Sequence, residues 1–143
     1  MSEASTTEHE QMLNTYQDYE DLWNGDFSKL DVVTESIVLS DPSLLDGELH
    51  GREAFEAYLR EVRSAFPDWH VVADDLLVDD GIIMKAWTIT GTHKGEYEGV
   101  PPTGREIEIN GMAKDIIAEG KVQEARLYYD PQEVPEQLGL TED

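Results

Sequence analysis

The sequence contains no cysteine and few basic residues: 10 Lys and Arg stand against 32 Asp and Glu, a formal net charge of -22. Without cysteine the chain forms no disulfide bonds and has no thiolate chemistry. The shortage of Lys and Arg excludes the basic patch that binds nucleic acids and anionic membrane surfaces. We therefore expect neither nucleic acid nor a membrane as a partner.

Long apolar runs are also missing, since none reaches the roughly 20 residues of a transmembrane helix. Residues 1–10 are acidic, unlike a secretory signal, so we predict a soluble, cytoplasmic protein. The four histidines lack the paired spacing of metal ligands, and Asp79-Asp80-Gly81 departs from a calcium-binding loop. Phosphate-loop and dinucleotide motifs do not occur. The sequence therefore predicts no metal and no cofactor.

The acidic excess is spread along the whole chain. Like charges at this density repel one another and destabilise the compact state in dilute buffer. At about 1 M salt the screening length falls to about 3 Å, which removes most of this repulsion. We interpret the composition as adaptation to a salt-rich cytoplasm, as in a halophile, and keep an ordinary acidic protein as the alternative.

Two long helices are predicted from apolar residues that recur with a helical period. The first ends at Gly25, a residue that serves as a left-handed helix cap. The second begins at Gly51 and stops before Pro67, whose ring cannot continue the hydrogen-bond ladder. A short helix is expected over 28–33. The apolar face of the first helix carries Met12, Tyr16, Tyr19 and Trp23.

The apolar period changes to two in the second half of the chain, which predicts strands joined by short turns. Helices followed by strands indicate the α+β class, with a curved antiparallel sheet covered by helices on one face. We expect one domain over 1–143, with flexible ends at 1–7 and 140–143. A sheet that wraps around a helix leaves an open cone suited to a small ligand. The predicted strands are 37–40, 69–78, 82–92, 105–117 and 121–129.

Several short motifs occur in a combination that is more specific than any one of them. They are Leu22-Trp23-Asn24-Gly25-Asp26, Phe66-Pro67-Asp68, Gly91-Thr92-His93, Pro102-Thr103-Gly104-Arg105, Tyr129-Asp130 and Gln137-Leu138-Gly139. Together they span about residues 12 to 139. In this respect the sequence resembles the SnoaL-like polyketide cyclases of the nuclear-transport-factor-2-like superfamily.

The resemblance implies a SnoaL-like or cystatin-like α+β barrel, a cone-shaped curved mixed sheet around the N-terminal helices. It also implies a homodimer through the open sheet face. Characterised cyclases of the family close a ring of a polyketide ester by intramolecular aldol condensation, without metal or cofactor. The expected ligand is then a small, largely apolar carbonyl compound. The same fold hosts isomerases, dehydratases and non-catalytic binding modules, which remain alternatives.

An aldol ring closure needs a base that takes a proton from carbon and an acid that protonates the new alkoxide. One buried carboxyl group can do both when desolvation raises its pKa toward neutrality. The resemblance assigns this catalytic role to Asp130, at the end of the last strand. The alternative is that Asp130 caps the turn before Pro131, as Asp-Pro pairs often do.

Two further residues are candidates for chemistry. His93 could donate a hydrogen bond to a developing enolate or shuttle a proton, or it could be structural and fix the bend after its strand. Arg126 could bind an anionic group of the substrate. A buried arginine is costly unless it is paired, so a bridge to Glu124, Asp115 or Asp130 is the alternative.

A set of large apolar residues could line the substrate pocket with Arg126. Stripes of this kind are also typical of an ordinary core, and both interpretations stay open. The set comprises Tyr16, Trp23, Trp69, Trp87, Met112 and Tyr128.

Salt adaptation predicts that the protein melts at a higher temperature in about 2 M KCl than in dilute buffer, because salt screens the repulsion between its carboxylates. Differential scanning calorimetry over a KCl series measures this directly. An unchanged melting temperature would show that the acidic composition is not an adaptation to salt.

Overall fold

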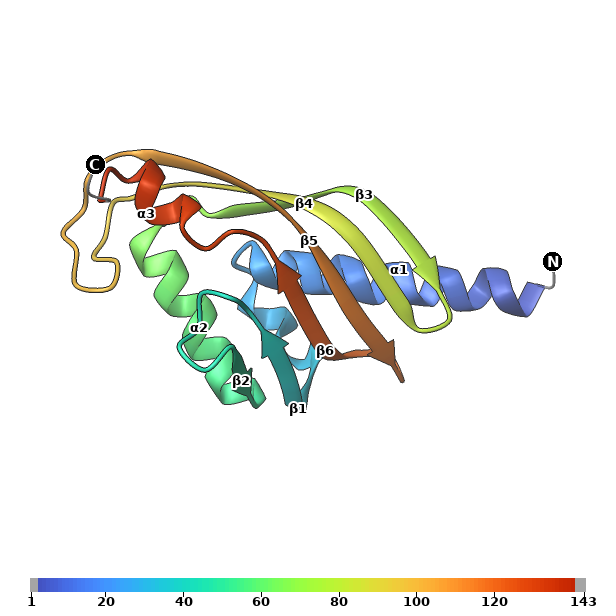
Figure 1. The fold of residues 1–143 in the computed structure, drawn as a ribbon. Helices are drawn as coiled ribbons and strands as arrows, with labels where there is room; N and C mark the ends of the chain where they lie inside the picture. Colours follow the sequence, from blue (N-terminus) through green and yellow to red (C-terminus); the bar gives the residue numbers. More distant parts are fainter. Residues whose placement is uncertain (1–2, 141–143) are drawn as a thin grey trace.

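The computed structural model describes residues 3–140, with side chains from residue 7 on. Within these residues, none of the helices combines the length and apolar character needed to cross a membrane. Figure 1 shows a long helix lying under a curved sheet, with the shorter helices gathered near one end. The elements are α1 (Glu3–Trp23), η1 (Phe27–Val32), β1 (Val33–Ser40), β2 (Glu48–His50), α2 (Arg52–Ala65), β3 (His70–Asp79), β4 (Ile82–Thr92), β5 (Glu106–Ala118), β6 (Lys121–Tyr128) and α3 (Glu133–Gln137).

One six-stranded sheet with the order β2-β1-β6-β5-β4-β3 forms the wall of the cone. All neighbouring strands are antiparallel except β1 and β6, which run parallel, so the sheet is mixed. The register shifts between Ala73 and Asp75 and between Ile116 and Ile117. Such irregularities bend strands and help the sheet to curve. The predicted α+β class and curved cone are confirmed.

Helix α1 fills the concave side of the sheet with the apolar face expected from its sequence period. Tyr19 and Leu22 are fully buried, and Tyr19 stacks on Phe55 of α2 with ring centroids 6.3 Å apart. The Trp23 ring meets the same Phe55 edge-on at 6.0 Å. These contacts join both long helices and the sheet into one core.

Element boundaries differ from the sequence expectation at three places. Strand β1 begins at Val33 instead of Ile37, and the three-residue β2 was not predicted. Helix α1 begins at Glu3, so residues 3–7 of the predicted flexible N-terminal end are helical. Residues 1–2 and 141–143 of the expected flexible ends lie outside the described residues.

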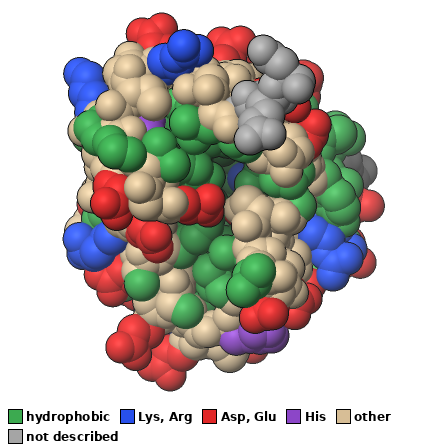
Figure 2. Space-filling model, turned by 60° about the vertical axis from the view of Figure 1, so that its left-hand side comes forward, with side chains coloured by type: hydrophobic (Ala, Val, Ile, Leu, Met, Phe, Trp, Pro, Cys, Tyr) green, Lys and Arg blue, Asp and Glu red, His purple; other side chains and the backbone are tan. Residues whose placement is uncertain are grey.

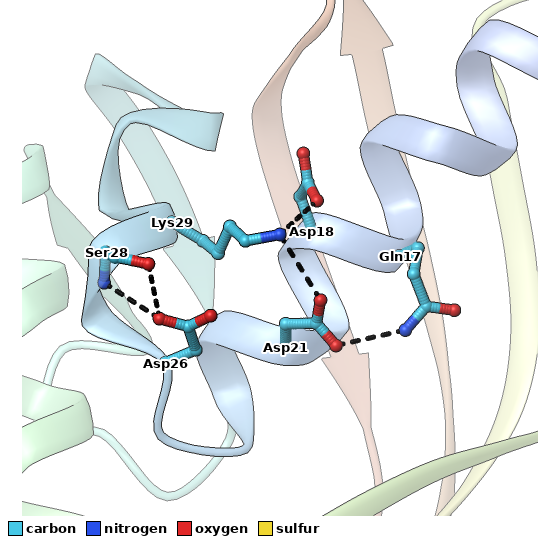
Figure 3. Close-up of polar contacts among 6 residues, drawn as sticks. All are labelled: Gln17, Asp18, Asp21, Asp26, Ser28 and Lys29. Carbon is cyan, nitrogen blue, oxygen red and sulfur yellow. Dashed lines mark hydrogen bonds and ion pairs between the residues drawn. The ribbon is translucent and has the colours of Figure 1, made fainter.

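A polar cluster fixes the turn between α1 and η1, which leads into β1 (Figure 3). The Lys29 ammonium lies 2.7 Å from an Asp18 carboxylate oxygen and 3.5 Å from one of Asp21. The Asp26 side chain accepts a hydrogen bond from the Ser28 backbone N–H at 3.1 Å and caps η1. Exposed ion pairs contribute little to stability, so the role of the cluster is mainly geometric.

Candidate functional site

Two cavities lie on the concave side of the sheet. The first, called the mouth pocket, has a volume of about 140 Å³ and lies between α2, α3 and the segments 43–44 and 96–98. The second, called the interior cavity, has a volume of about 20 Å³ and lies between α1 and the sheet. Two edge-on ring pairs separate them: Trp23 with Tyr58 at 6.0 Å, and Trp87 with Tyr129 at 5.6 Å.

Lys85, which lines the interior cavity, forms a buried ion pair with Asp115, which is not itself a lining residue. Lys85 on β4 and Asp115 on β5 are 5% and 0% exposed, and the ammonium nitrogen is 3.1 Å from Asp115 Oδ2. In the β4–β5 register Lys85 is opposite Ala113 and Asp115 is opposite Ile83, so the two side chains are diagonal neighbours on the concave face. Buried pairs of this kind are weak evidence for stability, because desolvation offsets their attraction.

Aromatic rings surround the Lys85 ammonium on the side of α1. Its nitrogen lies 4.5 Å from the centre of the Tyr16 ring and 5.3 Å from that of Tyr19, within the range of cation–π contacts. Both rings line the interior cavity together with Trp87. The cavity therefore has aromatic walls with the Lys85 ammonium at one side.

Several polar atoms near this pair lack a hydrogen-bond partner among the described residues. They are the Tyr19 hydroxyl, the Trp87 indole nitrogen and both carboxylate oxygens of Asp115, which contacts Lys85 without hydrogen-bond alignment. Buried polar atoms in proteins are nearly always paired, with protein or with ordered water. Their presence beside a cavity large enough for one water molecule indicates a place for a polar ligand atom.

The Asp115 carboxyl group has the property that acid–base chemistry requires. Burial raises its pKa above the ordinary value, and the nearby Lys85 ammonium lowers it by less. The pKa of Tyr16 and of Tyr19 is also raised, first by burial and then by the neighbouring carboxylates, so both phenols stay protonated. Asp115 thus has the raised pKa that the sequence analysis required of a catalytic carboxyl group.

A second buried carboxylate, Asp41 at the end of β1, lies beside the mouth pocket and is 1% exposed. One of its oxygens accepts hydrogen bonds from the Ser43 backbone N–H and hydroxyl, both at 2.8 Å, and from the Tyr129 phenol at 2.7 Å. The other accepts the Tyr58 phenol at 2.5 Å. Ser43, Tyr58 and Tyr129 all line the pocket.

The catalytic candidate Asp130 lines neither cavity. Its side chain is exposed and accepts a hydrogen bond from the Gln132 backbone N–H at 3.0 Å, just before α3. This is the turn-capping arrangement that the sequence left open. Arg126 is 48% exposed and lies 3.6 Å from Glu124, one of the partners considered for it, and it lines neither cavity. The catalytic role of Asp130 and the binding role of Arg126 remain predictions.

The second catalytic candidate, His93, is fully buried at the end of β4. Its Nδ1 accepts the Thr103 backbone N–H at 3.1 Å, which leaves the ring proton on Nε2. The Nε2 atom has no partner among the described residues. The ring packs against Phe66 and Tyr97 at 5.5 and 6.2 Å, and Tyr97 lines the mouth pocket. His93 therefore fixes the bend after β4, and its catalytic role remains a prediction.

The predicted pocket residues fall into three groups. Tyr16, Trp23 and Trp87 line the interior cavity, and Trp69 lines the mouth pocket. Met112 and Tyr128 pair across β5 and β6 and are 51% and 50% exposed, on the opposite face of the sheet from the cavities.

Sequence reasoning missed Lys85 and Asp115 as site residues, although a signal for them exists. Each is the single charged residue on an otherwise apolar face: Lys85 stands between Ile83 and Trp87, and Asp115 between Ala113 and Ile117. Opposite charges on two adjacent strands, each inside an apolar alternation, predict a buried pair.

Comparisons with known proteins agree on one family and one fold. The family model of the SnoaL-like polyketide cyclases matches residues 13–138. Among solved structures, AclR from Streptomyces galilaeus is 23% identical with a TM-score of 0.78, over 94% of this chain and 84% of that one. TsrD from Streptomyces laurentii is 21% identical with a TM-score of 0.78, over 99% of both chains. A SnoaL-like polyketide cyclase from Agrobacterium tumefaciens is 20% identical with a TM-score of 0.70, over 87% and 95%. The curated proteins contain no match.

The buried pair predicts an asymmetry between single and double substitutions. Lys85→Met leaves Asp115 without its partner and should lower the free energy of unfolding by about 3–5 kcal/mol at pH 8. This loss should shrink as the pH falls toward the ordinary carboxyl range, because an Asp115 with a raised pKa is then protonated and neutral. The double variant Lys85→Met with Asp115→Leu should recover most of the stability.

Urea unfolding in concentrated KCl, at pH 8 and pH 5, measures these differences. Lys114→Met, on the opposite face of β5, is the control and should change the free energy of unfolding by less than about 0.5 kcal/mol. A double variant as unstable as Lys85→Met would show that packing, not charge, explains the loss.

Proposed function

This chain belongs to the SnoaL-like polyketide cyclase family, and we propose that it acts on a small, largely apolar carbonyl compound by acid–base catalysis inside its cone. The proposed reaction is the aldol-type ring closure of a polyketide-like substrate, without a cofactor. The observation that carries the proposal is the buried ion pair between Lys85, which lines the interior cavity, and Asp115 directly behind it.

Each step of the reaction has a residue suited to it. The Asp115 carboxylate takes a proton from the carbon next to a carbonyl group, and the carbonyl oxygen gains the negative charge of an enolate. The Lys85 ammonium stabilises that charge. The enolate carbon then bonds to the second carbonyl carbon of the same molecule. Asp115 returns the proton to the new alkoxide, so no redox partner is needed.

The size of the interior cavity suits a single oxygen atom of the ligand. Its volume of about 20 Å³ exceeds the roughly 10–15 Å³ that one water molecule needs. The empty space around it, including open solvent, is about 330 Å³. A carbonyl oxygen would lie beside Lys85, while the rest of the ligand lies along the Tyr16 and Trp87 rings toward solvent.

The charge of the pair supports a neutral ligand. An ammonium and a carboxylate at 3.1 Å cancel at a distance, so the cavity attracts neither anions nor cations strongly. It still offers donors, on Lys85 and on the unpartnered Trp87 indole, to an acceptor oxygen. A ketone or an ester carbonyl has this combination of properties.

Asp130 and His93 remain the rival assignment of the catalytic residues, with Arg126 orienting the substrate. An isomerase or dehydratase would share the proton abstraction but not the ring closure. These possibilities differ in which variant loses activity and in which product forms, so one experiment separates them.

A second candidate is a non-catalytic binding or dimerisation module. Large aromatic side chains occupy much of the cone, and the opposite face of the sheet exposes apolar residues. On that face Met112 and Tyr128 are half exposed and adjacent, and Met84 is 40% exposed. An exposed apolar surface of this kind favours association, and we propose a homodimer through it.

Ring closure is tested with heptane-2,6-dione, whose intramolecular aldol reaction followed by loss of water gives 3-methylcyclohex-2-enone. The wild-type protein should accelerate formation of the ring product, followed by proton NMR in concentrated KCl. Asp115→Asn should lower the rate about 100-fold or more, because it removes the proton acceptor. Asp130→Asn is the matched control and should leave the rate unchanged.

Loss of activity in Asp130→Asn alone would assign the base to Asp130 instead. Exchange of the protons next to the carbonyl groups without a ring product would indicate an isomerase-type activity. Binding without any acceleration would favour the non-catalytic module.

The dimer is tested by Met112→Glu, which places a charge on the exposed apolar face. Sedimentation equilibrium should show a dimeric wild-type protein and a dissociation constant raised about tenfold or more for the variant, because a buried unpaired carboxylate opposes association. Leu45→Glu, at a fully exposed loop position, is the control and should remain dimeric. A monomeric wild-type protein would contradict the proposal.

A further inference from the structure

The mouth pocket is lined mainly by aromatic side chains and is distinct from the interior cavity. Five rings contribute to its wall: Tyr58, Phe66, Trp69, Tyr97 and Tyr129. Its volume of about 140 Å³ is small beside the roughly 300–1,000 Å³ of common ligand sites, which suits one compact group. The faces of aromatic rings carry negative partial charge and attract cations.

A buried carboxylate without a counter-ion, Asp41, lies behind the wall of this pocket, hydrogen-bonded to lining residues but not itself one of them. The four hydrogen bonds to the Asp41 carboxylate come from neutral donors on Ser43, Tyr58 and Tyr129. Among the described residues, no Lys, Arg or His nitrogen lies within 4.0 Å of it. Hydrogen bonds stabilise the carboxylate but leave its charge in place, whereas buried charges in proteins are usually paired.

Further carboxylates line the pocket at its rim. Glu61, Glu96 and Glu98 are exposed lining residues. Figure 2 shows one face of the molecule, on which hydrophobic side chains surround a hollow and acidic side chains lie near it. Acidic residues are common on this protein, so the rim alone says little. The rim carboxylates are informative because the buried Asp41 carboxylate lies behind them.

The pKa values of three tyrosines in the pocket are raised, partly by these negative charges. The pKa of Tyr97 is raised to about 12, first by burial and then by the charges of Glu98, Asp41 and Glu61. The pKa values of Tyr58 and Tyr129 are raised as well, with the Asp41 charge second to burial. Three separate phenols are thus kept protonated, first by burial and then by nearby negative charges that would also stabilise a positive group in the same space.

We propose that the mouth pocket is a second ligand site, which binds a quaternary ammonium or a protonated amine. Anions are excluded by the Asp41 charge and the acidic rim. A metal ion fits poorly, because four donors already occupy the Asp41 oxygens, and the described residues contain no cluster of three potential metal ligands. An organic cation does not need to coordinate the Asp41 oxygens, and it can pack against the aromatic rings. The proposal is independent of chemistry at Asp115.

The test compares choline with 3,3-dimethylbutan-1-ol, in which a neutral carbon replaces the charged nitrogen. Isothermal titration calorimetry at constant ionic strength should show choline binding at least about tenfold more tightly. Asp41→Asn should weaken choline binding about tenfold or more and leave the neutral alcohol unchanged. Circular dichroism shows whether this variant is folded.

A second variant leaves the buried Asp41 unchanged. The triple change Glu61→Gln, Glu96→Gln and Glu98→Gln removes only exposed rim charges and should weaken choline binding about threefold or more, because partly exposed charges are screened. The control changes Asp79→Asn, Asp80→Asn and Glu119→Gln in two distant turns, removes the same number of charges, and should have no effect. Equal binding of choline and the alcohol, or equal losses in both triple variants, would overturn the proposal.

Discussion

The structure depends on how the concave face of the curved sheet is covered. Six strands wrap around one side of α1, and the Tyr19, Leu22 and Trp23 side chains fill most of the space between them. Because ring-shaped side chains of fixed size cannot fill a cone completely, two voids remain, separated by edge-on ring pairs. The chemistry that the fold offers is set by which polar atoms border those voids.

A buried carboxylate contacts lining residues of each void, and the chain stabilises the two carboxylates in different ways. Asp115 has a cationic partner but no aligned hydrogen bond, so its buried oxygens keep unused capacity to accept a proton or a hydrogen bond. Asp41 has four neutral donors and no cation among the described residues, so its oxygens accept hydrogen bonds without an opposite charge beside them. The first environment supports proton transfer, and the second supports attraction of a positive group.

Most of the fold could be predicted from the sequence, because the helical and two-residue periods, Pro67 and the Gly turns are local signals. The candidate site could not be predicted in the same way. A period of two divides Met84, Lys85 and Trp87 between two faces without showing which face is concave. The partners of Asp41 lie 17 and 88 residues away, so the Asp41-Pro42 pair indicated only the end of a strand. The family resemblance directed attention to Asp130, one strand away from Asp115.

The positions of Asp130 and Asp115 on the sheet explain why their carboxyl groups have different properties. At the end of β6 the side chain of Asp130 accepts a hydrogen bond from the backbone N–H of Gln132 and is exposed to solvent. In the middle of β5 the Asp115 side chain is surrounded by core residues and shares the cone with Lys85. Burial, not position in a motif, gives a carboxyl group the raised pKa that proton transfer to carbon requires. The two carboxylates therefore have different surroundings: Asp130 caps a turn in solvent, whereas Asp115 is buried beside the opposite charge of Lys85 on the adjacent strand.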